Sequence, residues 1–432
     1  MYLMSFDRMS SKFLSKNNNT VTAALDIGTD KIICLIVRNF ISQKGDYNFE
    51  IIGIGHNQSR GMASGGIVDS SDLELAIRAA VESAEKMSSV TVDRIAINIS
   101  TETVRSNIYE ISIPIKEIQV TQKDIETALK VASEQKISDD NEIIQTIPLG
   151  FSIDGVSGIE DPIGMYAEKL DININVITCK RSSVQNLCRV VENAHAQVDK
   201  IVVSPISSAI STLTIDEANL GSILIDMGAG TTSFSVFDNG ILKDVGIIPI
   251  GGNDITKDIA RALSTPIEEA ERLKILYGGV LTNSYDDGDL LTVPIAGYGG
   301  KNKNDQKLSK SVIADIARAS ILELFEKIKN RLLDVSESLY HDKIIVLTGG
   351  GSQLIGVDEL AGEIFNGPIR RALPEASSDL FDISNPIFSN IIGLVTYSQN
   401  DIFVNKKITT QRLSSKSNNF LTNTINWFKD GF

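Results

Sequence analysis

Two short segments, half a chain apart, carry the same succession of residue types. The first runs from Val21 to Lys31 and the second from Ser222 to Thr232. Each begins with an apolar run typical of a buried strand, continues with an aspartate (Asp26 or Asp226) and a glycine-containing turn with threonine, and ends in a second β-rich run. The repetition predicts two strand–turn–strand hairpins with an acidic tip, in duplicated halves that face each other.

Turns of this composition suit phosphate chemistry. Glycine lets the backbone come close to a phosphate group, and the surrounding N–H and hydroxyl donors hold phosphate oxygens. An aspartate in this setting would not touch phosphate directly, so Asp26 and Asp226 would act through a divalent cation or its water shell. The pattern predicts a clamp for a phosphate-containing ligand.

The elements that must position these hairpins can be outlined from periodicity. A capping-box signature from Ser71 to Glu74 predicts a helix that runs to about Lys86. A strong strand, 343–348, leads into Gly349-Gly-Gly-Ser352 and an amphipathic helix. Residues 251–332 are mostly helical in pattern, apart from a polar loop at 283–310 in which 290–295 has strand character.

The stretch from 101 to about 178 has a different pattern of predicted strands and helices. Alternating strands at 104–114, 142–153 and 170–178 surround one helix at about 121–135. This composition predicts a separate α+β insert.

Composition limits the class of protein. A chain of 432 residues forms roughly two to four domains, and no apolar run reaches the roughly 18 residues of a spanning helix. Three cysteines without metal-ligand spacing favour a reducing cytoplasm, and the three isolated histidines disfavour a metal site of their own. A net charge of −14 argues against nucleic acid as a partner.

The two ends of the chain differ from its body. Residues 1–20 are polar, lack the apolar region of a signal peptide and read as a flexible extension. Residues 402–432 hold five basic residues and one acidic residue, so a basic tail follows an acidic body. This asymmetry suggests that the tail meets an anionic surface.

Taken in order, the two hairpins and the glycine run resemble the two phosphate signatures and the adenosine signature of the actin/Hsp70/sugar-kinase superfamily. The resemblance implies ATP as the cofactor, with Mg²⁺ held through Asp26 and Asp226. Ala229 stands where a glycine is common, a modest departure. By this resemblance the nucleotide-binding residues of the three signatures are Asp26, Gly28, Thr29, Lys31, Asp226, Gly228, Gly230, Thr231, Thr232, Gly349, Gly350, Gly351 and Ser352.

A charged helical segment, 266–274, follows the second loop and Gly251-Gly252. Spacing alone fits an exposed helix face. By resemblance to the superfamily, a glutamate and a lysine on this helix reach the ribose and the base, and these positions fall on Glu271 and Lys274.

Four further segments, 59–69, 161–165, 251–256 and 265–271, resemble the FtsA family of bacterial cell-division proteins. The likeness runs from about Val21 to Gln399 and resumes in the last helix. It implies an α/β, actin-like (ribonuclease H-like) fold with duplicated domains. The implied organisation is a flexible extension (1–20), subdomain 1A (21–100 and 179–215), a small α+β insert 1C (101–178), subdomain 2A (216–250 and 333–399), a helical subdomain 2B (251–332), a linker (400–418) and an amphipathic membrane-targeting helix (419–432).

The family resemblance also implies partners and a place in the cell. These are FtsZ, a tubulin-like protein bound through 2B, further copies of the chain in actin-like filaments, and other division proteins through 1C. The expected location is the cytoplasmic face of the bacterial inner membrane at the division septum, where the protein would anchor the FtsZ ring and help assemble the septum machinery.

The resemblance does not predict fast ATP hydrolysis. ATPases of this superfamily hold the attacking water with a Gln or Glu near the turn that corresponds to 203–209. This turn offers Ser204, Ser207 and Ser208 but no acid, amide or histidine, and a serine hydroxyl is a poor base near neutral pH. No residue is therefore assigned as catalytic, and ATPase activity is expected to be weak or absent.

The last fourteen residues form an amphipathic pattern. A polar linker before them weakens packing on the protein's own core, although packing on another chain remains an alternative, and Lys429 beside a tryptophan favours the membrane interface. Leu421, Ile425, Phe428 and Phe432 lie on one helical stripe, which Phe420 and Trp427 widen.

Two other functions fit parts of the pattern. Another actin-like protein, of a cell-shape filament or of pilus assembly, usually lacks such an insert together with a C-terminal membrane helix. An active Hsp70-like ATPase would need a peptide-binding domain, and the roughly 30 residues after Asn400 are too few to form a domain.

Overall fold

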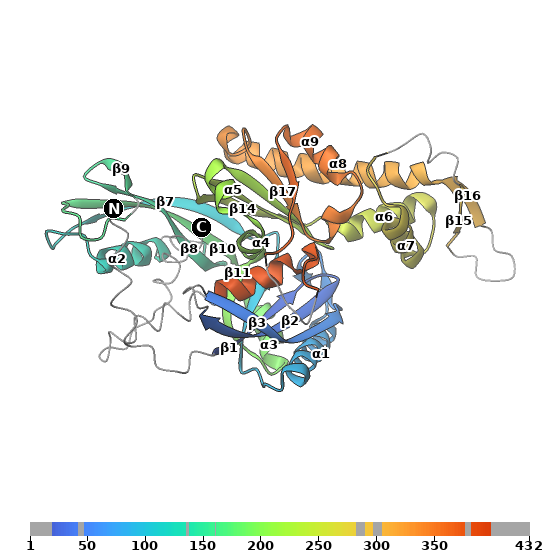
Figure 1. Cartoon of the computed structure of the whole chain (residues 1–432), viewed down its shortest axis with the longest axis horizontal. Coiled ribbons are helices and arrows are strands. Elements are labelled where there is room, and N and C mark those ends of the chain that lie inside the picture. The colour runs from blue at the N-terminus through green and yellow to red at the C-terminus, as the bar shows by residue number, and fades with distance from the viewer. Residues whose placement is uncertain are drawn as a thin grey trace.

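The computed structural model describes residues 20–41, 47–134, 138–159, 161–281, 290–296, 305–375 and 382–398. Three sheets make up most of the molecule (Figure 1). The predicted linker 400–418, membrane helix 419–432 and most of the extension 1–20 lie outside the described residues. No helix in the described part is long and apolar enough to cross a membrane.

The first sheet holds the first predicted hairpin. Its strand order is β11-β6-β1-β2-β3, with β1 antiparallel to β2 and parallel to β6. α1 (Ser70–Ser88) contacts β2 and β3, and α3 (Arg181–Asn193) packs beside β11. The strands are β1 (Thr20–Ile27), β2 (Lys31–Ile41), β3 (Tyr47–Gln58), β6 (Arg94–Ile99) and β11 (Gln197–Val203).

The second five-stranded sheet repeats this topology. Its order, β14-β13-β12-β17-β18, matches the first sheet strand for strand, including two antiparallel pairs and two parallel pairs. The strands are β12 (Ser222–Met227), β13 (Thr232–Asp238), β14 (Ile241–Ile248), β17 (Ile344–Thr348) and β18 (Ile369–Arg371). The sequence prediction of duplicated halves is thereby confirmed.

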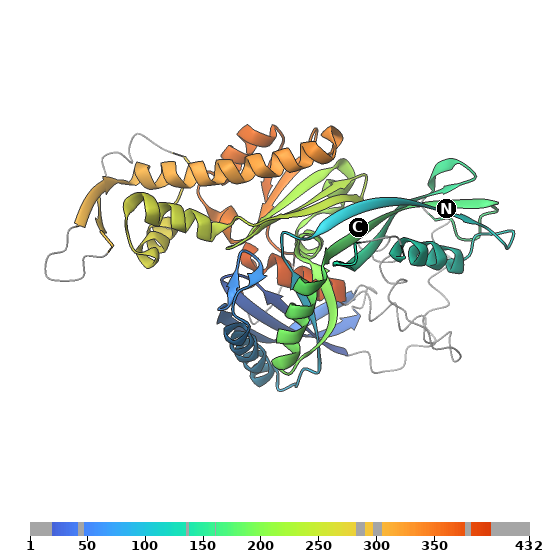
Figure 2. The same cartoon turned by 180° about the vertical axis from the view of Figure 1, so that it is seen from behind.

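The segment between β6 and α3 forms a third sheet of its own, in the order β7-β10-β8-β9, covered by α2 (Gln122–Ser133). It has a separate apolar core that contains Leu129, Ile172 and Val176. This α+β insert lies at one end of the long axis in Figures 1 and 2. Its strands are β7 (Arg105–Pro114), β8 (Asn141–Ile153), β9 (Val156–Ile159) and β10 (Lys169–Lys180).

At the opposite end of the long axis stands a largely helical region (Figure 2). Its helices α6, α7 and α8 share an apolar core with one face of the second sheet, formed by residues such as Ile223 and Phe234. The elements are α6 (Gly252–Leu263), α7 (Ile267–Tyr277), the hairpin of β15 (Leu290–Pro294) and β16 (Asp305–Ser309), and α8 (Lys310–Val335); α9 (Val357–Phe365) follows β17.

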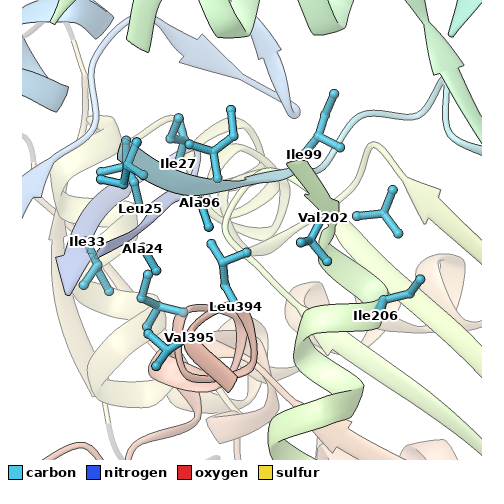
Figure 3. Packing of buried hydrophobic residues seen from close by; sticks show 14 of the residues in the cluster. Ala24, Leu25, Ile27, Ile33, Ala96, Ile99, Val202, Ile206, Leu394 and Val395 are labelled. Atoms are coloured by element: carbon cyan, nitrogen blue, oxygen red, sulfur yellow. The ribbon is translucent and has the colours of Figure 1, made fainter. Parts of the chain in front are cut away.

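Two helices lie between the duplicated sheets. α4 (Ser204–Thr212) and the helix at 389–398 belong to a core that includes residues of both sheets. Figure 3 shows Leu394 and Val395 of the second helix directed toward Ala24 and Ile33 of the first sheet. Residues of both halves pack against this helix, which lies in the range predicted for subdomain 2A.

Candidate functional site

Both predicted hairpins close in the same way. The N–H of Gly28 donates to the carbonyl of Lys31 over 3.0 Å, and the N–H of Gly228 donates to the carbonyl of Thr231 over 2.9 Å. At each glycine a Cβ would lie less than 3.0 Å from the accepting carbonyl oxygen, so the turn leaves no room for a side chain. The two loops are structural counterparts, as the sequence predicted.

The two loops also touch each other. A Cβ on Gly230 would lie 2.4 Å from the hydroxyl oxygen of Thr29, so the second loop approaches the first through its backbone. The hydroxyls of Ser100 and Thr231 lie 3.0 Å apart and join the end of β6 to the second loop. The halves therefore meet at their phosphate-loop residues.

Between the halves lies a cavity of about 690 Å³, a volume within the range of small-molecule sites. Thirteen of the fifteen predicted nucleotide-binding residues line it, and they are Asp26, Gly28, Thr29, Lys31, Asp226, Gly228, Gly230, Thr231, Glu271, Lys274, Gly349, Gly350 and Gly351.

The other two predicted residues do not line the cavity. Thr232 is fully buried opposite Met227, and its hydroxyl donates to the carbonyl of Ile250 over 2.9 Å. The hydroxyl of Ser352 is buried and donates to the carbonyl of Gly349 over 2.7 Å. Alternation along β13 directs the side chain of Thr232 away from the cavity, and the 3₁₀ turn does the same for Ser352. Both side chains therefore stabilise the backbone of the loops. Their assignment as cofactor contacts is corrected.

Asp26 is held by the end of β6. Its carboxylate accepts a hydrogen bond of 2.7 Å from the amide of Asn98, and that amide also donates to Ser204 and accepts from the N–H of Ile27. The pKa of Asp26 is raised to about 7, mainly because the carboxyl group is buried. The charge of Lys31 lowers this pKa, and the charge of Asp226 raises it. A neighbouring negative charge thus faces Asp26 across the cavity.

Asp226 has a different support. Its carboxylate accepts a hydrogen bond of 2.5 Å from the hydroxyl of Ser208 on α4. Burial raises its pKa, while this bond and Lys31 oppose the rise. Burial likewise lowers the pKa of Lys31, whereas Asp26 and Asp226 raise it. Lys31 therefore interacts electrostatically with both carboxylates.

The charges of these three side chains bear on whether a divalent cation fits in the cavity. Two partly desolvated carboxylates share one cation, Lys31, and retain raised pKa values. Hard oxygen ligands of this kind suit Mg²⁺, which keeps several waters and bridges carboxylates to phosphates. The residues present fit a Mg²⁺-bound phosphate chain, which Asp26 and Asp226 would hold through the cation.

Gly349 gives a physical reason for the start of the glycine run. Its φ is +81°, and a Cβ would lie 2.3 Å from the carboxylate of Asp226. Only glycine lets the chain after β17 pass directly against the aspartate. Gly351 similarly packs against Met227.

Glu271 and Lys274 form one network on α7. The ammonium group of Lys274 lies 2.7 Å from Glu271, 2.8 Å from the hydroxyl of Thr256 and 3.0 Å from the carbonyl of Gly252. Both side chains line the cavity beside the second loop.

Sequence reasoning missed several lining residues. Asn98 lies in β6, a strand without a glycine signal, Ser100 directly follows this strand, and Asn390 lies in the first turn of the shared helix. Two exposed aliphatic side chains, Ile275 (70% exposed) and Ile355 (68%), line the end near Lys274.

Comparison with known proteins agrees with this geometry. A family model described as "Cell division protein FtsA" matches residues 223–393, and one described as "SHS2 domain inserted in FTSA" matches 101–178, the range predicted for the insert. The cell division protein FtsA of Agrobacterium fabrum is 38% identical over 90% of this chain and 89% of its own. The chain belongs to the FtsA family.

Other relatives extend the similarity. FtsA of Pseudomonas aeruginosa is 33% identical over 89% of this chain and 90% of its own, and FtsA of Escherichia coli K12 is 26% identical over 97% of this chain and all of its own.

Solved structures share the actin-like fold at low identity. A PilM–PilN type IV pilus biogenesis complex chain has a TM-score of 0.61 at 16% identity, covering 88% of this chain and 98% of its own. MreB5 of Spiroplasma citri bound to ADP has a TM-score of 0.55 at 13% identity, covering 91% and 99%. At such identities the similarity shows the fold, and the fold prediction is confirmed.

Proposed function

We propose that this FtsA-family protein takes part in cell division by binding Mg²⁺–ATP between its duplicated halves. The observation that carries the proposal is the pair of aspartates, Asp26 and Asp226, on equivalent hairpins that face one cavity. Lys31 would neutralise phosphate charge, while the loop N–H and hydroxyl groups would hold phosphate oxygens. The MreB5 neighbour bound to AMPPNP supports a nucleotide in a cavity of this fold.

We further propose that bound ATP sets a shape and is turned over very slowly. Ser204, Ser207 and Ser208 stand where a water-orienting group is expected, and Ser208 is engaged with Asp226. The amide of Asn98 also lines the cavity, but its oxygen and both hydrogens already have partners. To hold a water, Asn98 would have to release Asp26, Ser204 or the backbone of β1.

Membrane anchoring completes the proposal. Residues 419–432 carry the amphipathic stripe, and the acidic body would leave the basic tail to meet an anionic membrane. One short helix binds weakly, so filaments of the protein would add avidity. In this role the protein would hold a division filament, FtsZ, at the cytoplasmic face of the inner membrane, with the insert open to other division proteins.

The test is co-sedimentation of the full chain with anionic vesicles, with and without Mg²⁺–ATP. Removal of 419–432 is expected to abolish sedimentation, and Phe428→Asp in the stripe should do the same. Asn423→Asp, which adds the same charge on the polar face, is the matched control and should leave binding nearly intact. Sedimentation that persists without 419–432 would refute membrane binding through this helix.

A further inference from the structure

The segment from Ser59 to Asp69 folds into a small hairpin outside the two phosphate loops. Its strands are β4 (Met62–Ala63) and β5 (Gly66–Ile67), and they pair antiparallel. The hairpin stands between the end of β3 and the start of α1.

The backbone fixes the shape of this hairpin. Its two turn residues, Ser64 and Gly65, have φ values of 45° and 74°, as in the tight turns whose twist matches paired strands. At its root the carbonyl of Gly61 accepts from the N–H groups of Val68 and Asp69 over 2.8 and 3.1 Å. The tight turn and these hydrogen bonds restrain the hairpin.

The root of the hairpin is tied to the first phosphate loop. The N–H of Ser59 donates to the carbonyl of Asp30 over 2.8 Å. The carboxylate of Asp69 caps α1 by accepting from the N–H groups of Ser71 and Asp72. The root therefore has a fixed position relative to the first loop.

The tip reaches the second half of the molecule. A Cβ on Gly65 would lie 1.8 Å from the carbonyl oxygen of Ser100 and 2.9 Å from the methyl group of Thr231. Ser100 and Thr231 are themselves joined through their hydroxyls, and the carbonyl of Thr231 closes the second loop by accepting from Gly228. The tip thus lies against Thr231, the residue whose carbonyl closes the second phosphate loop.

We propose that the hairpin β4–β5 is a clasp that positions the second phosphate loop and retains the phosphate chain of the bound nucleotide, with Gly65 as its positioning residue. This inference rests on the proposed nucleotide function. Gly65 lines the cavity at its phosphate-loop end, so a displaced tip would open the loops without touching the base end. The clasp is specific for phosphorylated ligands, because adenosine alone does not span the loops.

The test compares Gly65→Ala with Gly66→Ala in the full chain. A methyl group at Gly65 meets backbone in a strained conformation, whereas at Gly66 its nearest neighbour, the carbonyl of Ala63, is at an ordinary 3.5 Å. With fluorescent Mg²⁺–ATP, Gly65→Ala should speed release about tenfold, as strain of this size implies, and Gly66→Ala should not. Adenosine affinity should stay unchanged in both variants, an outcome that general destabilisation would not give.

Ser100→Ala is a second variant in case Gly65→Ala fails to fold, since it removes the hydroxyl that meets Thr231 and leaves the hydroxyl of Thr231 in place. It should speed release of ATP by a smaller factor and again spare adenosine. Equal release rates in wild type, Gly65→Ala and Ser100→Ala would overturn the clasp alone. Absence of saturable ATP binding by the wild type, with no effect of Asp26→Ala, would overturn the proposed function and the clasp together.

Discussion

The two halves of the molecule share a strand order and a loop closure but differ in the chemistry of their loops. The first loop carries charge: Asp30 and Lys31 follow Asp26, and an amide, Asn98, holds the aspartate. The second loop has no charged residue after Asp226 and is rich in glycine and threonine. Duplication therefore explains the shared geometry of the two loops. The residues after each aspartate differ: the first loop has a further carboxylate and a lysine, and the second has small hydrogen-bond donors.

The halves also differ in what is inserted into them. The first half carries the α+β insert after β6, whereas the second carries the helical region after β14. The α+β insert lies at one end of the long axis and the helical region at the other (Figure 1). None of the described residues of the insert lines the shared cavity, whereas Glu271, Lys274 and Ile275 of the helical region do. The insert therefore lies outside the ligand site, and the helical region forms part of it.

The largest expected effect comes from removing either aspartate. Asp26→Ala and Asp226→Ala should each weaken Mg²⁺–ATP binding by about 100-fold, because each removes an anchor for the cation. Equilibrium titration with a fluorescent ATP measures this. Asp199→Ala, in a surface ion pair with Arg94, is the control and should bind like wild type. If only one aspartate mattered, the two halves would not share the cation.

The next effect is the pH dependence of the free energy of unfolding that Asp26 causes. In the ligand-free protein the pKa of Asp26 is about 7, above its ordinary value near 4. Protonated Asp26 therefore stabilises the folded protein, by on the order of 4 kcal/mol. This contribution is full below about pH 4 and is lost as the pH rises through 7. Urea unfolding of Asp26→Asn, compared with wild type from pH 4 to 8, should lack this loss. An identical pH profile in both would contradict the environment described for Asp26.

A smaller effect is expected at the end of the cavity near Lys274. Ile275→Ser or Ile355→Ser should weaken ATP binding about tenfold, because each removes apolar surface that a base can cover. Inorganic tripolyphosphate should bind both variants as it binds wild type. The control is Leu276→Ser, which alters an exposed side chain (55%) on the same helix that does not line the cavity.

The smallest effect concerns the departure in the second loop. Ala229 has no positive φ, so the alanine is unstrained and Ala229→Gly should change ATP affinity by less than about twofold. A gain of tenfold or more in the same titration would show that this residue limits the second loop.

Sequence was a good guide to elements whose signals are local. The hairpins around Asp26 and Asp226 and the boundaries of most strands follow from apolar runs and glycine turns. The predicted start of α1 was late by one or two residues. The capping box at Ser71 was expected to begin the helix, but the side chain of Asp69 caps it by accepting from the N–H groups of Ser71 and Asp72.

Contacts between distant segments could not be predicted in the same way. Asn98 reaches Asp26 only because β6 lies beside β1, and Asn390 reaches the cavity only because its helix packs between the sheets. Thr232 and Ser352 were assigned to the ligand by motif, and their directions became clear only from the register of β13 and the turn after β17. The strand β16, within the polar loop 283–310, was not foreseen because its pattern DQKLS has few apolar residues.

The central claim is that the duplicated loops grip ATP and scarcely turn it over. One experiment measures both: the wild-type full chain is titrated with Mg²⁺–ATP to obtain the stoichiometry, and phosphate release is followed in the same samples. The account predicts one saturable site per chain and release well below about 1 per second, the lower end of ordinary enzyme rates. Absence of binding, or brisk phosphate release, would contradict it.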